Sequence, residues 1–174
     1  MERKNAWLSY GESDEKEMEK LAKDYRAFLD AGKTERECVT ELVREAEANG
    51  YVSLEAKQAA GEKLQPGDKV YAVGMKKIMA LFHVGREPLE KGMNILGAHI
   101  DSPRLDVKQN PLYEDTDLAY LDTHYYGGVK KYQWVALPLA IHGVIAKKDG
   151  SVVNVTIGED ENDPVVYITD LLIH

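Results

Sequence analysis

The most informative stretch of this sequence is Gly97-Ala98-His99-Ile100-Asp101-Ser102-Pro103-Arg104-Leu105-Asp106. The apolar run Met93–Ala98, directly before His99, predicts a short β-strand. Because residues two apart in a strand point to the same side, we expect His99 and Asp101 to leave the sheet edge together. An imidazole and a carboxylate would then stand side by side at the end of the strand.

This histidine–carboxylate pair is typical of a zinc ligand and the group that supports it. Asp101 could accept one ring N–H of His99 and so leave the other ring nitrogen free for a metal. A lone histidine is more often a structural residue, so the spacing alone leaves both interpretations open. Ser102-Pro103 predicts a stiff turn, and Ser102 lacks the Gly-x-Ser-x-Gly context of a nucleophile.

The residues before this motif predict helices. An apolar stripe between a capped, acidic start and a closing glycine indicates a helix over residues 13–32. Thr34 and Glu37 form a capping box for a second helix over residues 34–50, and a shorter helix is expected over residues 53–60.

Strand signals follow the helices. Lys69–Val73 and Lys77–Val84 are predicted strands, and together with the helices they indicate an α/β fold with part of a mixed sheet over residues 1–105. From residue 106 to 174 the chain is expected to form a β-rich domain. Asp149-Gly150 predicts a hairpin turn there, between an apolar run and an alternating one.

Composition excludes several classes of protein. A net charge of −8 and a pI near 5.2 argue against a nucleic-acid-binding protein, and the longest apolar run, Ile78–Val84, is too short to span a membrane. The single cysteine, Cys38, excludes an internal disulfide and lies on an apolar helix face, so we expect a core residue. The first residues carry no apolar signal core, so we expect a cytoplasmic protein.

The remaining histidines and the acidic cluster give weaker signals. His83 and His142 lie among apolar neighbours and are expected to be buried or at an interface, and His124 is expected in a loop. Glu159–Asp163 is interpreted as a solvated turn rather than a cation site.

A longer pattern surrounds the motif. GAHIDSPRLDVK (97–108) resembles the signature of the aspartyl aminopeptidase/aminopeptidase I family of dinuclear zinc exopeptidases, in particular its bacterial aminopeptidase 1 branch. The resemblance continues at NPLYED (110–115), YYGGVKKYQW (125–134) and ITDLLIH (168–174). It implies the N-terminal part of a zinc-exopeptidase domain followed by a β-rich inserted domain.

The resemblance also implies a site. His99 matches the family's first zinc ligand, Asp101 its catalytic carboxylate, and His174 a histidine that binds metal or contacts substrate. It further implies peptide substrates, two zinc ions per complete site (or cobalt or manganese), and a large closed homo-oligomer. The family's remaining ligands, including a Glu-Glu pair, lie C-terminal to the matched region, and no such pair occurs after residue 106. We therefore expect a fragment that binds metal weakly and has no turnover.

The sequence is also compatible with two other functions. The apolar and aromatic residues 125–145 could make the chain a non-catalytic oligomerisation or interaction module. Alternatively, His99 and Asp101 could serve a mononuclear hydrolase that takes a further ligand from a partner chain.

Overall fold

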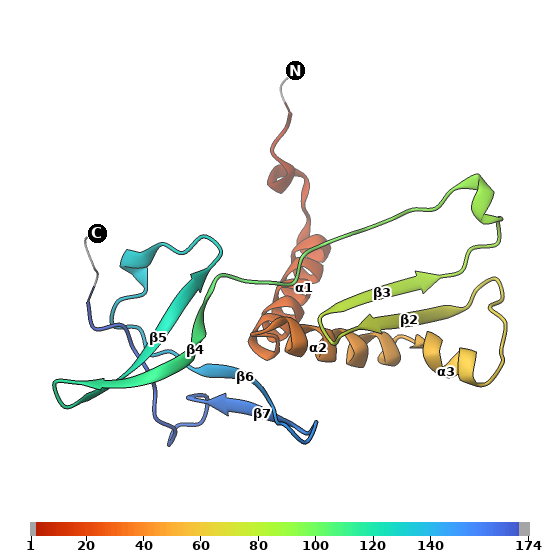
Figure 1. Cartoon of the computed structure of the whole chain (residues 1–174). Coiled ribbons are helices and arrows are strands. Elements are labelled where there is room, and N and C mark those ends of the chain that lie inside the picture. Colours follow the sequence, from red (N-terminus) through yellow and green to blue (C-terminus); the bar gives the residue numbers. More distant parts are fainter. Residues whose placement is uncertain (1–2, 171–174) are drawn as a thin grey trace. The chain divides into compact units, whose positions relative to one another are not determined.

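The computed structural model describes residues 3–170, and it is divided into two compact units, Met1–Ile100 and Asp101–His174 (Figure 1). Helices and a small sheet form the first unit, and strands dominate the second. This confirms the mixed α/β class. None of the described helices has the length and apolar composition needed to cross a membrane.

Three α-helices form the first half of unit 1, as the sequence predicts. After a short 3-10 turn at Ala6–Ser9, they span Glu12–Ala31 (α1), Glu35–Ala48 (α2) and Leu54–Ala59 (α3). The Thr34 hydroxyl accepts from the backbone N–H of Glu37, whose carboxylate accepts in return from the backbone N–H of Thr34. This confirms the predicted capping box.

A three-stranded mixed sheet completes unit 1. Its strands are Val52–Ser53 (β1), Lys69–Gly74 (β2) and Ile78–His83 (β3), in the order β1-β2-β3. β1 pairs with β2 in parallel, and β2 pairs with β3 antiparallel. α2 runs along this sheet (Figure 1), and the small core lies here. Its buried apolar residues are Cys38, Val39, Ala46 and Val70.

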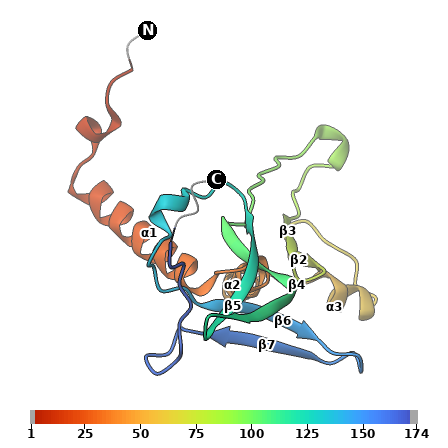
Figure 2. The same cartoon turned by 60° about the vertical axis from the view of Figure 1, so that its left-hand side comes forward.

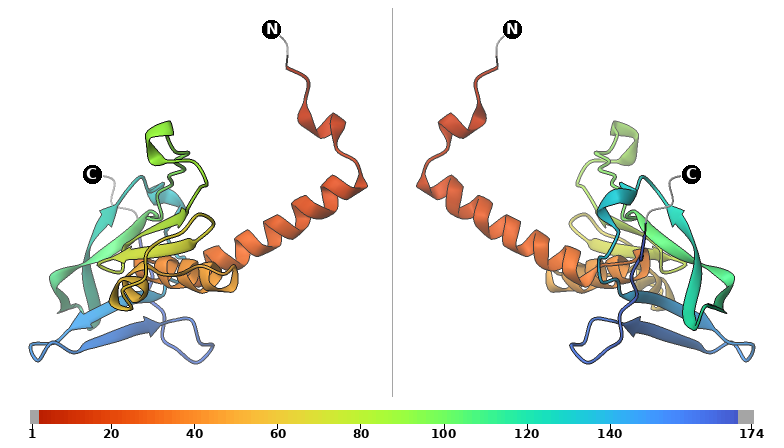
Figure 3. Two further views of the ribbon diagram at one scale, coloured as in Figure 1. Left: turned by 90° about the vertical axis from the view of Figure 1, so that its right-hand side faces the viewer. Right: turned by 90° about the vertical axis from the view of Figure 1, so that its left-hand side faces the viewer.

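The apolar stripe of α1 is largely uncovered. Leu21 is 70% exposed and Tyr25 is 59% exposed. α1 contacts α2 near the α1–α2 turn, and its N-terminal part extends away from the sheet of the same unit (Figure 3). The stripe therefore predicts the helix correctly but does not form a core within the described residues.

Two antiparallel hairpins form unit 2 (Figure 2). The first joins Arg104–Asp115 (β4) to Leu118–Tyr126 (β5), and the second joins Ile141–Ala146 (β6) to Val152–Ile157 (β7). The second hairpin confirms the turn predicted at Asp149-Gly150. The first places His124 in β5, so the prediction of a loop position for this residue was wrong.

The prediction of a strand at Met93–Ala98 was wrong. After a 3-10 turn at Leu89–Lys91, the chain has neither helix nor strand from residue 92 to 103. Ile95 is 81% exposed and Leu96 is 99% exposed. A strand needs a neighbour for its backbone N–H and C=O groups, and no described strand pairs with this segment.

Candidate functional site

His99 lies on the exposed connection that ends unit 1. Its ring is on the surface rather than at the edge of a sheet, because the expected strand before it is absent. One residue further on, the Ile100 carbonyl oxygen lies 3.7 Å from the Cys38 thiol, which can donate to it. Buried Cys38 is part of the α2 core, so this contact ties the chain next to His99 to the packed part of unit 1.

The buried position of Cys38 also governs its chemistry. Removal from water raises the pKa of the Cys38 thiol, and the nearby carboxylates of Glu37 and Glu35 raise it further. The thiol therefore stays protonated at neutral pH, which confirms the prediction of a core residue rather than a nucleophile.

Asp101 begins unit 2 and is half-buried. Its Oδ2 accepts a hydrogen bond of 2.9 Å from the Tyr126 hydroxyl at the end of β5. Hydrogen bonds to a charged acceptor are stronger than neutral ones and fix the direction of the carboxylate. Sequence reasoning did not assign a site role to Tyr126.

Arg104 supports this contact from the neighbouring strand. It is paired with Tyr126 across the β4–β5 ribbon, and its guanidinium carbon lies 4.2 Å from the centre of the Tyr126 ring. The Arg104 Nε also forms an ion pair of 2.7 Å with Asp106 Oδ1, two residues along β4 on the same face. Arg104 and Tyr126 come together through the register of β4 with β5. The sequence did not predict this register.

His174, the third predicted site residue, lies outside the described residues. The structure therefore does not test its role as a metal ligand or a substrate contact. The boundary between the compact units falls between Ile100 and Asp101. His99 therefore belongs to unit 1, and Asp101 belongs to unit 2.

A zinc ion needs more ligands than the described residues bring together. Protein zinc sites have three or four ligands from cysteine, histidine and carboxylate side chains. Within residues 3–170 no group of three or more such side chains could hold a metal ion. The roles of His99 and His174 as metal ligands therefore stay predictions.

The other candidate residues have structural surroundings. His142 is mostly buried, as predicted, and its Nε2 lies 2.8 Å from the Glu159 carboxylate. His83 is exposed on β3, so it is not buried within the described residues, and the alternative of an interface position stays a prediction. In the acidic turn, Asp163 accepts from backbone N–H groups of the same turn, as a solvated turn would.

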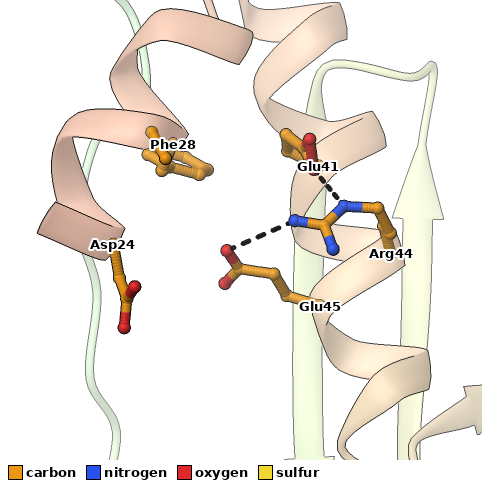
Figure 4. Close-up of a pocket in the computed structure, with 6 residues that line it drawn as sticks. Asp24, Phe28, Glu41, Arg44 and Glu45 are labelled. Atoms are coloured by element: carbon orange, nitrogen blue, oxygen red, sulfur yellow. Dashed lines mark hydrogen bonds and ion pairs between the residues drawn. The ribbon is translucent and has the colours of Figure 1, made fainter. Parts of the chain in front are cut away.

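A shallow hollow of about 360 Å³ lies between α1 and α2 (Figure 4). Arg44 is held there between Glu41 and Glu45, opposite Asp24 and Phe28. None of the residues predicted for the site lines this hollow. We therefore assign no role in the reaction to it.

Comparison with known proteins identifies the class. The sequence profile described as Aminopeptidase I zinc metalloprotease (M18) matches residues 28–174, which is most of the chain and includes His99 and Asp101. The chain therefore belongs to this family of zinc metalloproteases.

Individual relatives agree over the whole sequence. The probable M18 family aminopeptidase 1 of Clostridium acetobutylicum is 61% identical over 173 residues, which are 99% of this chain and 37% of that protein. The crystal structure of aminopeptidase I from Borrelia burgdorferi matches with a TM-score of 0.88 at 39% identity, over 98% of this chain and 41% of that one. The M18 aminopeptidase structure from Thermotoga maritima matches with a TM-score of 0.85 at 45% identity, over 100% and 37% respectively.

The sequence spans only part of these relatives. It covers 37% of the length of the Clostridium protein and 37% of the Thermotoga protein. The comparisons thus show the fold and the family of this chain. They do not show the activity of the whole protein.

Proposed function

We propose that the protein containing this chain is a zinc-dependent aminopeptidase, a hydrolase that removes N-terminal residues from peptides in the cytoplasm. The observation that carries this proposal is the family match over residues 28–174, which includes the His-x-Asp motif. The 61% identity to a probable M18 aminopeptidase 1 supports the same activity. A lone cysteine, which cannot form an internal disulfide, fits a reducing compartment.

His99 is the proposed first zinc ligand, and it is an exposed residue. Asp101 is the proposed catalytic carboxylate, and its hydrogen bond from Tyr126 supports a fixed orientation. His174 is proposed to bind metal or contact substrate. A complete site would hold two zinc ions, or cobalt or manganese in their place. We propose that its other ligands lie C-terminal to the matched region, as the resemblance to the family implies.

We further propose that the isolated 174-residue polypeptide binds metal weakly and has no turnover. Two predicted histidine ligands are too few to hold a pair of divalent ions. Purified 174-residue chain should release no N-terminal residue from peptides after addition of zinc, cobalt or manganese. Sustained release under these conditions would overturn this proposal.

Residues 106–174 are proposed to belong to an inserted β-rich domain that contributes to a homo-oligomer. Its support is the exposed apolar surface of both hairpins, where Leu112 is 72% exposed and Val152 is 57% exposed. A purely non-catalytic association module is not proposed, because the family match points to a metallopeptidase.

The aminopeptidase proposal is tested with the natural protein that contains this sequence. The substrates are a peptide with a free N-terminus and the same peptide acetylated at that end. An aminopeptidase releases the first residue from the free peptide only, loses this activity on dialysis against a chelator, and regains it with zinc. Equal cleavage of the acetylated peptide, or activity that survives metal removal, would contradict the proposal.

A further inference from the structure

The Asp101 carboxylate is held from the base of the β4–β5 ribbon. The Tyr126 hydroxyl donates to Asp101 Oδ2 at 2.9 Å, and the Tyr126 ring lies under the guanidinium of Arg104 at 4.2 Å. Arg104 is in turn fixed by its ion pair with Asp106. The chain of contacts therefore runs from a paired strand, through an aromatic ring, to the carboxylate.

We propose that Tyr126, backed by Arg104, is a positioning residue that fixes the orientation of Asp101 for the reaction. This inference rests on the proposed aminopeptidase function, in which Asp101 is the catalytic carboxylate. Tyr126 acts through Asp101 and takes no part in bond making or breaking.

The backbone around Tyr126 is suited to this task. Tyr126 is the last residue of β5, in register with Arg104, so its Cα is fixed by the ladder. Gly127 follows with φ of +74°, a conformation that other residues adopt only with strain. A Cβ on Gly127 would lie 3.5 Å from the Pro103 Cα, so the turn after β5 runs directly against the segment that carries Asp101.

The chemistry of the donor also matters. A tyrosine hydroxyl is neutral, so its hydrogen bond orients the carboxylate without cancelling its charge. A tyrosine side chain has only two main torsions, and the cation above the ring restricts them further. Catalytic groups need orientation within fractions of an ångström, which such a rigid donor can supply.

The first experiment measures the contact without relying on activity. In the natural protein, the rate at which a carbodiimide and an amine modify the Asp101 carboxylate is followed by peptide mass spectrometry. Tyr126→Phe removes only the hydroxyl and retains the ring under Arg104. We expect it to raise the modification rate at Asp101 about five- to tenfold. Tyr125→Phe, the matched control on the opposite face of the ribbon, should leave the rate unchanged.

The second experiment measures the role in the reaction by a double-mutant cycle with Asp101→Asn. Tyr126→Phe alone should lower kcat about tenfold or more with KM little changed. On the Asp101→Asn background the same change should have little further effect, since the proposed role of Tyr126 depends on the charged carboxylate of Asp101. Independent, additive losses would indicate a merely structural role and overturn the inference.

The two experiments distinguish a failure of the positioning role of Tyr126 from a failure of the proposed aminopeptidase function. An unchanged modification rate in Tyr126→Phe overturns the positioning contact whatever the activity. A raised modification rate with unchanged kcat shows that the contact does not serve the reaction and also overturns the inference. A lack of turnover in the wild-type protein would reject the proposed function. A raised modification rate in Tyr126→Phe would, in that case, still support the hydrogen bond from Tyr126 to Asp101.

Discussion

At the scale of single residues, the His-x-Asp motif is held by different neighbours at its two ends. The chain beside His99 is tied to the α2 core through the contact of Ile100 with Cys38. Asp101 is held by Tyr126 from the strand-rich second unit. The residue types and their spacing predict His99 and Asp101 as site residues, whereas the contacts come from distant positions: Cys38 contacts the Ile100 backbone from 62 residues earlier, and Tyr126 contacts Asp101 from 25 residues later.

The environment of Cys38 gives a prediction at this scale. Burial raises the pKa of its thiol, so at pH 8 the folded protein has less thiolate than an unfolded chain. Modification by a thiol-specific disulfide reagent at pH 8 should be at least about tenfold slower in the folded protein than in urea. The pKa of the Cys38 thiol is higher in the folded protein than in the unfolded chain. The free energy of unfolding that the protonated thiol contributes should therefore be lost as the pH rises through the pKa of the folded protein.

The measurement is the rate of thiol release, followed by absorbance, with and without urea. The difference between the wild-type protein and its Cys38→Ala variant gives the signal of Cys38 in each state. Equal rates in the folded and unfolded protein would show that the thiol is not buried.

At the scale of elements, the β4–β5 hairpin depends on an unusual turn. Thr116 and Asp117 have φ values of +52° and +61°, although neither is glycine. Two successive residues with positive φ match the right-handed twist of a hairpin, and such turns favour Asn-Gly. The Asp117 N–H donates to the Glu114 carboxylate at 3.0 Å, which partly offsets the strain.

Asp117→Gly should therefore stabilise the hairpin. Glycine adopts positive φ without steric cost, so we expect the free energy of unfolding to rise by about 0.5–1 kcal/mol. Asp115→Gly, the control two residues away in β4, should lower it by about the same amount because glycine weakens a strand. Urea denaturation measures both changes. A loss of stability in Asp117→Gly would contradict this account of the turn.

The elements differ in how far the sequence predicts them. The helices of unit 1 were predicted because each has a local signal, such as the Thr34–Glu37 capping box. The β6–β7 hairpin was predicted because Asp149-Gly150 is a typical turn, whereas the turn at Thr116-Asp117 has no glycine and gave no such signal. The prediction of a strand at Met93–Ala98 was wrong because the pairing of a strand with its neighbours is not a local property of the sequence. None of the described strands pairs with this segment.

At the scale of the whole molecule, most of the large apolar side chains that the structure describes are exposed to solvent. Among the described residues, four apolar side chains are buried, whereas large apolar side chains are exposed on α1, β3 and both hairpins. Soluble monomers rarely expose extended apolar patches. The candidate site could be predicted only in part, because His99 and Asp101 lie in one local motif, whereas Tyr126 reaches Asp101 through the pairing of β4 with β5, which is not a local property of the sequence.

We propose that His99 is a zinc ligand of the aminopeptidase that contains this chain. The measurement is zinc content together with the release of N-terminal residues, in the natural protein and in its His99→Ala variant. His83→Ala, which removes an exposed histidine on β3, is the matched control. We expect His99→Ala to lose bound zinc and at least about 100-fold of kcat/KM, and His83→Ala to keep both. Full zinc content and activity in His99→Ala would contradict the account.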